Sequence, residues 1–308
     1  MNTPSRPRRS PPRALLAALR PRQWIKNGVV FAALILTRGL GDAPKTLAVL
    51  AVCGLFCAIS SAVYLINDVS DIANDRQHPE KRFRPLATGE LSPRAALLAS
   101  AVLIAVGVGG GFLFTPNANG LPMVGLIILA YLGLQIAYTF FLKHQLIVDV
   151  MAIAGGFVLR VLVGGAAIDE PISSYLYLSM IFLALFQGFS KRRHELQVLA
   201  DAAGEHRASL SQYTIPLLDQ FIIVAATATI VTYALYAITT PYRPSAVSPN
   251  MLLLTVPFVI YALFRYMYLV QVLGMGGAPE ELVLRDRLLL SAGIGWLTSL
   301  LVMLYLIP

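Results

Sequence analysis

Four residues that could bind a metal ion follow the second long apolar stretch of the sequence. Asn67, Asp71 and Asp75 lie four residues apart, so a helix places them on one face, with Asp68 beside them. Carboxylates at this spacing repel one another by roughly 0.2–0.5 kcal/mol per pair, and they also meet the negative end of the preceding helix. A divalent cation reverses both penalties, and hard oxygen ligands suit Mg²⁺, which usually also binds substrate phosphates. The motif therefore predicts a magnesium site, with a solvated charged loop as the alternative.

A basic cluster follows the sixth apolar stretch. Lys191, Arg192 and Arg193 come directly after it, and Glu195 completes the group. The general excess of Lys and Arg in cytoplasmic loops explains basic residues in this connection. It does not explain why they lie directly at the membrane exit, facing the acidic motif in the same aqueous layer. Two opposed clusters of this kind could hold a magnesium-bound diphosphate and a second phosphate.

Two ionisable residues lie inside the fifth apolar stretch. Asp149 and Arg160 are eleven residues apart, which places them nearly on one helix face. An ionisable residue inside a span costs about 2.5–3.5 kcal/mol on insertion scales, and both a functional and a structural role stay open for Arg160. Polar residues near the expected membrane interface are further candidates for phosphate contact. These residues are Lys26, Asn27, Lys143 and His144.

Nine apolar stretches are long enough, or nearly so, to cross a hydrocarbon core of ~30 Å. The chain has 308 residues, of which 57% are hydrophobic, and no long soluble domain remains outside these stretches. We therefore predict an all-α, polytopic membrane domain over residues 15–308, preceded by a disordered basic tail over residues 1–14. The stretches fall near residues 24–41, 46–66, 93–114, 121–142, 146–168, 172–190, 215–238, 250–272 and 287–307.

The net charge of +8 is unevenly distributed along the chain. Lys and Arg are concentrated before the first apolar stretch and after the second, fourth, sixth and eighth. The positive-inside rule then predicts a multi-pass protein of the cell membrane, with a cytoplasmic N-terminus and an external C-terminus. The basic composition follows from this orientation and from anionic ligands, because the sequence has no recognisable nucleic-acid-binding module.

The acidic motif at the end of a second span resembles that of the UbiA superfamily of intramembrane prenyltransferases. The resemblance implies nine helices around a central cavity that opens to the cytoplasm. Several segments narrow it to the decaprenyl-phosphate phosphoribosyltransferase branch. One departure is informative, because typical prenyltransferases carry a second aspartate-rich motif where this chain has the basic cluster. The segments that carry the resemblance are 20–27, 64–68, 78–85, 142–145, 191–195 and 284–287.

The resemblance implies transfer of 5-phosphoribosyl from phosphoribosyl diphosphate to a polyprenyl (decaprenyl) phosphate, with release of diphosphate, for cell-wall arabinan precursor synthesis. Mg²⁺ on the acidic motif would stabilise the leaving diphosphate, with Asp68, Asp71 and Asp75 as the catalytic carboxylates. Lys191 and Arg192 would orient the acceptor phosphate. The substrate-binding residues implied in addition to those above are Tyr64, Lys81, Arg82, Arg84 and Glu195.

Two other functions remain open at the level of sequence. One is prenyl transfer to an aromatic or other small acceptor, which supplying each donor and acceptor pair would distinguish. The other is transport, because intramembrane charges also mark transport paths. A transport path would place its key polar residues near the membrane midplane, whereas the motifs here lie in the connections. The oligomeric state and the prenyl chain length also stay open.

Overall fold

The structure of the protein is a computed structural model. It describes residues 9–77, 81–114, 120–200, 212–239, 251–277 and 279–306. Every regular element within these residues is a helix, which confirms the all-α prediction. His78, Pro79 and residues 1–8 of the predicted tail lie outside the described part.

The predicted disordered tail over residues 1–14 is in part helical. Helix α1 (Pro11–Ala18) begins with proline, whose fixed φ suits the first position of a helix. Ala14 and Ala18 are buried against Leu65 and Leu86, which belong to the end of α3 and to the connection that follows it. This packing, which proline and charge content do not reveal, brings residues 11–14 into the folded domain.

Seven helical segments of the described chain are long and apolar enough to cross a membrane, so the protein is a multi-pass membrane protein. Six of them include α3 (Ala43–Ser70), α5 (Pro93–Phe112), α6 (Met123–Phe140), α7 (Val148–Ile168), α9 (Ile215–Thr239) and α12 (Arg287–Leu301), the last continued by η7 (Val302–Leu306). The seventh combines η6 (Met251–Thr255) with α10 (Val256–Gln271). Helix α8 (Ser174–Ala200) carries the sixth predicted stretch and continues through the basic cluster.

The first predicted stretch, 24–41, is not one continuous α-helix. It consists of a 3₁₀-helix, η1 (Pro21–Phe31), followed by α2 (Ala32–Leu36) and the short η2 (Gly39–Gly41). Polar residues Lys26 and Asn27 interrupt its apolar character, and Arg38 takes a positive φ of 61°. The prediction of nine spanning helices is therefore not confirmed over the described residues.

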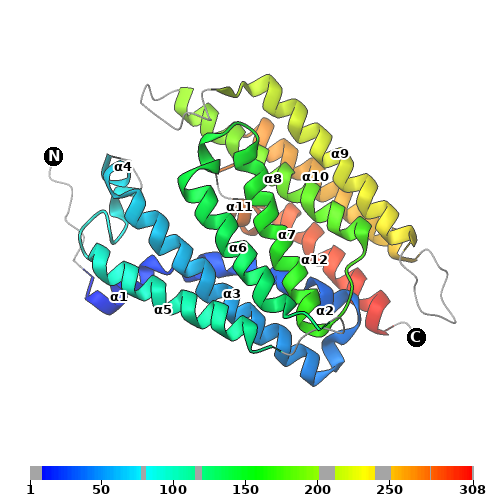
Figure 1. The fold of residues 1–308 in the computed structure, drawn as a ribbon. Coiled ribbons are helices and arrows are strands. Elements are labelled where there is room, and N and C mark those ends of the chain that lie inside the picture. The colour runs from blue at the N-terminus through cyan, green and yellow to red at the C-terminus, as the bar shows by residue number, and fades with distance from the viewer. Residues whose placement is uncertain are drawn as a thin grey trace.

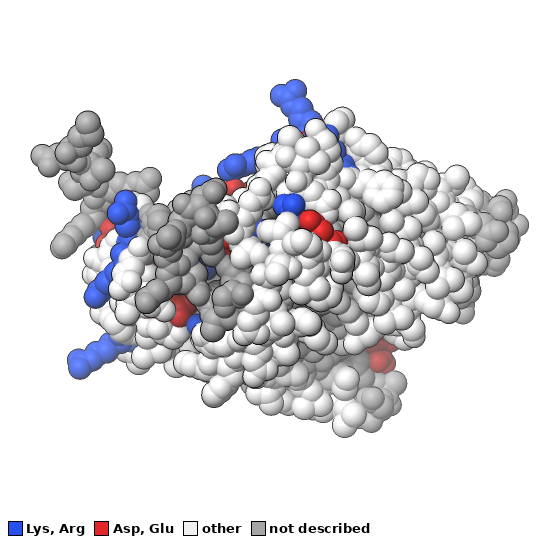
Figure 2. Space-filling view, turned by 90° about the horizontal axis from the view of Figure 1, so that it is seen from above, with Lys and Arg blue, Asp and Glu red and all other residues white. Residues whose placement is uncertain are grey.

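The long helices pack in pairs that run roughly side by side, α3 with α5, α6 with α7, α8 with α9, and α10 with α12 (Figure 1). One large apolar core lies among α8, α9 and α10, and another lies among η1, α3, α6 and α7. In Figure 1, α1 and α4 (Ile72–Gln77) lie at one end of the bundle, and the end of α12 lies at the opposite end. Figure 2 shows many Lys and Arg side chains near α1 and α4, beside a broad uncharged surface.

Glycine lets η1 approach α7 closely. A Cβ atom on Gly164 would lie 1.9 Å from the Val30 carbonyl oxygen, so any other residue would push the two segments apart. Small residues at helix contacts are typical of membrane proteins, where close van der Waals packing drives association. This contact fixes the position of the segment that leads from Arg20 towards α2.

Candidate active site

The acidic motif spans the junction of α3 and α4. Helix α3 ends at Ser70, and Asp71 leaves helical geometry with φ −99° and ψ 7°. The backbone N–H groups of Asp71 and Asp75 still donate to the carbonyl oxygens four residues earlier, at 3.0 and 2.8 Å. The predicted periodicity of Asn67, Asp71 and Asp75 therefore persists in the backbone across the junction. Asp68 and Asp75 are almost fully buried, at 1% and 4% exposure.

Two arginines neutralise the buried carboxylates. Arg84 Nη1 lies 3.1 Å from Asp68 Oδ1 and 2.7 Å from Asp75 Oδ2, so a single guanidinium bridges both acids. Arg20 also donates to Asp68 Oδ1, and its guanidinium lies 4.9 Å from the centre of the Tyr64 ring. Sequence analysis predicted Arg84 but missed Arg20 as a site residue, because no local spacing links it to Asp68.

A lysine from a distant part of the chain reaches the same motif. Lys143 lies on η4 (Leu142–His144), and its Nζ is 3.2 Å from Asp71 Oδ1. Asn67 Nδ2 donates to the other oxygen of Asp71, at 3.1 Å. Four segments that are separate in the sequence thus meet at the acidic motif, and we take their meeting point as the candidate active site. The segments lie near residues 20, 67–75, 84 and 143.

One buried oxygen atom of the site, Asp68 Oδ2, has no hydrogen-bond partner among the described residues. Leaving such an atom unsatisfied is costly, and a cation would remove the cost. Within the described residues, no three His, Cys, Asp or Glu side chains form a group that could hold a metal ion. Mg²⁺ usually takes only one or two protein carboxylates and completes its shell with waters and substrate phosphates. The acidic motif therefore fits a magnesium ion that is bound together with a phosphorylated substrate.

The basic cluster is used mainly inside the protein. Arg192 is 2% exposed, and its Nε lies 2.7 Å from Asp149 Oδ2. Its other two nitrogen atoms contact Glu195 and the Tyr138 hydroxyl. Arg193 pairs with Asp219 at 2.6 Å. The expectation that Arg192 meets an acceptor phosphate directly does not match this geometry, because a buried guanidinium needs compensating carboxylates.

Arg160 has a structural set of partners. Its three side-chain nitrogen atoms bond to Asn27 Oδ1 at 2.8 Å, to the Gly156 carbonyl at 2.9 Å and to the Tyr131 hydroxyl at 2.7 Å. Arg160 and Asn27 are both buried, and Asn27 Nδ2 also donates to Ser60 Oγ at 3.3 Å. These two predicted substrate-binding residues therefore connect η1 to α3, α6 and α7.

The remaining predicted residues keep access to solvent. Arg82 and His144 are exposed, whereas Lys26, Lys81 and Lys191 are partly exposed. Lys81 and Arg82 lie on η3 (Lys81–Phe83), directly before Arg84. These side chains are therefore more accessible to an anionic substrate than the buried Arg192 and Arg193.

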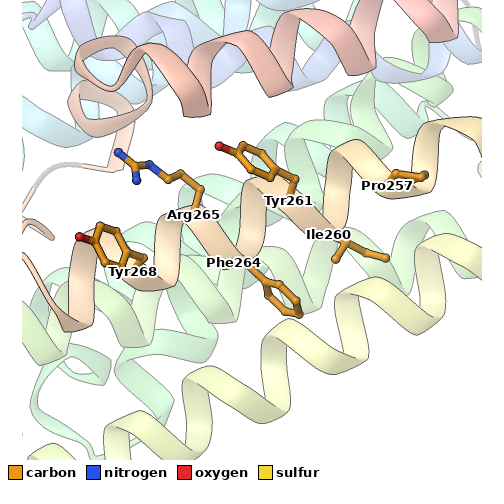
Figure 3. A pocket seen from close by; sticks show the side chains of 6 residues that line it. All are labelled: Pro257, Ile260, Tyr261, Phe264, Arg265 and Tyr268. Atoms are coloured by element: carbon orange, nitrogen blue, oxygen red, sulfur yellow. The ribbon is translucent and has the colours of Figure 1, made fainter.

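A groove of about 450 Å³ lies elsewhere, along α10. Arg265 lies in it between the aromatic rings and pairs with Asp286 at 2.7 Å (Figure 3). Among the described residues that line the groove, Arg265 alone is charged, so the groove lacks the cluster of cations that a diphosphate would need. The groove is lined by Pro257, Ile260, Tyr261, Phe264, Arg265 and Tyr268.

Comparison with known protein families and sequences gives consistent results. The model of the UbiA prenyltransferase family matches residues 28–273. A decaprenyl-phosphate phosphoribosyltransferase of Mycobacterium tuberculosis is 36% identical over 94% of this chain and 95% of its own length. The protein of the same name from Corynebacterium glutamicum is 34% identical over 98% of this chain and 91% of its own length.

Solved structures share the fold at low sequence identity. A UbiA homologue from Archaeoglobus fulgidus, bound to DMAPP and Mg²⁺, has a TM-score of 0.68 at 16% identity. The match covers 94% of this chain and 98% of that protein. The match to the fold thus extends over nearly all of both chains.

Proposed function

Because the chain belongs to the UbiA prenyltransferase family, we propose that it transfers a 5-phosphoribosyl group from phosphoribosyl diphosphate to a polyprenyl phosphate. Relatives that match almost its whole length carry the name of that activity. The observation that carries the proposal is the convergence of Arg20, Arg84 and Lys143 on the acidic motif, with a basic rather than acidic segment at 191–195. The product would serve cell-wall arabinan synthesis.

The reaction is a substitution at the anomeric carbon of the ribose. A bond forms between this carbon and an oxygen of the acceptor phosphate, while the bond to diphosphate breaks. Positive charge develops on the ribose and negative charge on the leaving group. The acceptor phosphate is already ionised at neutral pH, so the reaction requires no strong general base. The protein therefore acts chiefly through positioning and fixed charge.

Cationic side chains of the site are suited to hold the donor. Arg84 and Lys143 neutralise the carboxylates in the structure. Arg84 is partly exposed, and Lys143 is buried. Lys81, Arg82 and Lys26 have more accessible side chains and would contact the donor phosphates. Cations fixed in a partly dry site stabilise developing negative charge without having to reorganise during the reaction.

We assign magnesium binding to Asp68 and Asp75, with Asn67 and Asp71 at the more exposed side of the motif. The unsatisfied Asp68 Oδ2 atom supports this assignment, as does the Mg²⁺ bound to the Archaeoglobus fulgidus homologue. A bound Mg²⁺ would neutralise part of the charge that collects on the leaving diphosphate.

The acceptor site is assigned to the partly exposed side of the basic segment. Lys191 keeps its access to solvent, whereas Arg192 fixes α8 to α7 through Asp149. His144 is the second candidate for phosphate contact at this side. The polyprenyl tail of the acceptor would lie between the apolar helices.

The decisive experiment uses purified protein, ribose-labelled phosphoribosyl diphosphate, Mg²⁺ and a series of polyprenyl phosphates. We expect label in the lipid fraction with polyprenyl phosphates and none with the corresponding free polyprenols, because the acceptor supplies a phosphate oxygen. EDTA should abolish the transfer. Consumption of geranyl diphosphate with an aromatic acid, without use of phosphoribosyl diphosphate, would overturn the proposal in favour of prenyl transfer.

A further inference from the structure

A strained turn precedes α7. Ile147 has φ 67° and ψ −45°, and the Val148 N–H donates to the Leu146 carbonyl oxygen at 2.7 Å. This combination is a γ-turn of the rare type with a positive φ at its central residue. A β-branched residue strongly disfavours that conformation, so the surrounding structure must hold it in place.

Tyr213 binds the backbone of this turn from a distant part of the chain. The Ile147 N–H donates to the Tyr213 hydroxyl oxygen at 2.8 Å, and the hydroxyl donates to Asp149 Oδ1 at 3.1 Å. Tyr213 is 3% exposed, and Asp149 is fully buried and paired with Arg192. Burial raises the pKa of Tyr213 to about 12, so the phenol keeps its proton at physiological pH.

The turn lies directly between the candidate active site and α7. On one side, η4 presents Lys143 to Asp71 at 3.2 Å. On the other side, α7 is held by the buried Arg160 network and by the Gly164 contact. Since α7 cannot easily move, relaxation at Ile147 would swing the η4 segment and change the reach of Lys143.

We propose that Tyr213 is a positioning residue, which holds the strained turn at Ile147 and thereby places Lys143 against Asp71. Its effect on turnover rests on the proposed function, whereas its effect on Lys143 does not. The alternative is a purely structural hydrogen bond between the start of α7 and the segment before α9. In the positioning role, loss of the Tyr213 hydroxyl lets the turn at Ile147 relax and moves Lys143. In the purely structural role, Lys143 stays in place.

The test compares Tyr213→Phe, Ile147→Gly and the double variant. Tyr213→Phe keeps the ring but removes the hydroxyl and both of its hydrogen bonds. We expect a roughly tenfold loss of kcat, which corresponds to the net contribution of the bond that holds the turn. Glycine adopts positive φ without a Cβ penalty, so the turn should persist without the tyrosine hydroxyl. The double variant should therefore recover to within about threefold of Ile147→Gly.

A second measurement does not depend on the reaction. Lys143 is 8% exposed, so an amine-reactive acylating reagent should modify it slowly in the native protein, as read by mass spectrometry of its peptide. Tyr213→Phe should speed this modification, and added Ile147→Gly should slow it again. Tyr305→Phe is the matched control, because that hydroxyl donates to the Ile35 carbonyl at the opposite end of the bundle.

Two outcomes would overturn the positioning role. One is a loss of thermal stability in Tyr213→Phe with unchanged kcat and unchanged Lys143 modification. The other is failure of Ile147→Gly to restore Lys143 protection in the double variant. If the wild-type protein does not use phosphoribosyl diphosphate but the Lys143 pattern holds, the proposed function fails and the positioning role stands.

Discussion

The carboxylates of the acidic motif are paired with cationic side chains that their spacing in the sequence does not predict. The sequence places carboxylates on one helix face, where they repel one another. The structure places Arg84 between Asp68 and Asp75, and Arg20 beside Asp68, so the repulsion is already compensated before any metal binds. At the residue scale, the site is therefore a set of cations and carboxylates that compensate one another.

Replacing Arg84 should expose the metal site to direct measurement. In Arg84→Gln, Asp68 and Asp75 lose their common cation, so we expect a lower thermal stability in detergent without divalent ions. Added Mg²⁺ should raise the melting temperature of this variant more than that of the wild type, because the metal replaces the lost charge. Arg285→Gln is the control, since its pair with Glu281 is exposed. Equal Mg²⁺ responses in all three proteins would contradict the assignment.

At the scale of elements, the start of α12 depends on one carboxylate. Asp286 is the N-cap, and its Oδ1 accepts from the Leu289 N–H at 2.7 Å. Its second role is the ion pair with Arg265 on α10. The segment 284–287, which helped to establish the family resemblance, therefore has a structural function in joining these two helices.

The pH dependence of stability should separate the two roles of Asp286. The hydrogen bond from Arg265 lowers the pKa of Asp286 below its ordinary value of 3.8. The ionised carboxylate thus contributes stability that is complete above this value and is lost as the pH falls through the lowered pKa. Asp286→Asn keeps a good N-cap, so its deficit relative to the wild type should shrink in acid. Asp286→Ala should lose roughly 0.5–2 kcal/mol more in stability, because it also removes the cap.

Thermal unfolding between pH 3 and pH 7 measures both differences. A pH-independent deficit in Asp286→Asn would contradict the ion-pair role.

The contact between η1 and α7 should be sensitive to a single methyl group. Gly164→Ala places its Cβ within 1.9 Å of the Val30 carbonyl oxygen, a backbone atom that can move only with η1. We expect a loss of about 1–3 kcal/mol in stability, as in other overpacked sites, and reduced transfer because η1 follows Arg20. Gly133→Ala is the matched helix control, since nothing lies within 4 Å of its added Cβ. Similar losses in both variants would show that helical glycine itself, rather than this contact, matters.

The whole molecule is organised by its charge distribution. The end of the bundle with α1 and α4 carries the acidic motif and many Lys and Arg residues, and η2 precedes the opposite end of α3 (Figures 1 and 2). The positive-inside rule predicts that the charged end lies in the cytoplasm. This orientation would give the site access to a soluble phosphoribosyl donor and leave the lipid acceptor in the membrane.

Single exposed cysteines should report this orientation. Ser10→Cys lies before α1, and Gly41→Cys lies at the opposite end, before α3. We expect a membrane-impermeant maleimide to label Ser10→Cys only in inside-out vesicles and Gly41→Cys only in intact cells. The parent protein controls for Cys53 and Cys57, which are half-buried. The reverse pattern would place the active site outside the cytoplasm.

Sequence alone determined the helical membrane class, the seven apolar spans of the described chain, the family resemblance and the acidic motif. These features depend on local composition and on spacing within one helix, which the order of residues encodes directly. The chain segment 24–41 failed as a single span because polar residues inside it bind to other helices. Asn27, for example, accepts a hydrogen bond from Arg160 on α7.

Only the tertiary structure decided which charged residues compensate one another. Arg20 reaches Asp68, Lys143 reaches Asp71, and Arg192 is buried against Asp149 instead of facing an acceptor. These pairs join residues that are far apart in the chain, so no periodicity reveals them. Their selection follows from desolvation, because a charge buried among helices must find a partner wherever the packing brings one within reach. The strained turn at Ile147 has the same origin, since its partner Tyr213 is supplied by the fold.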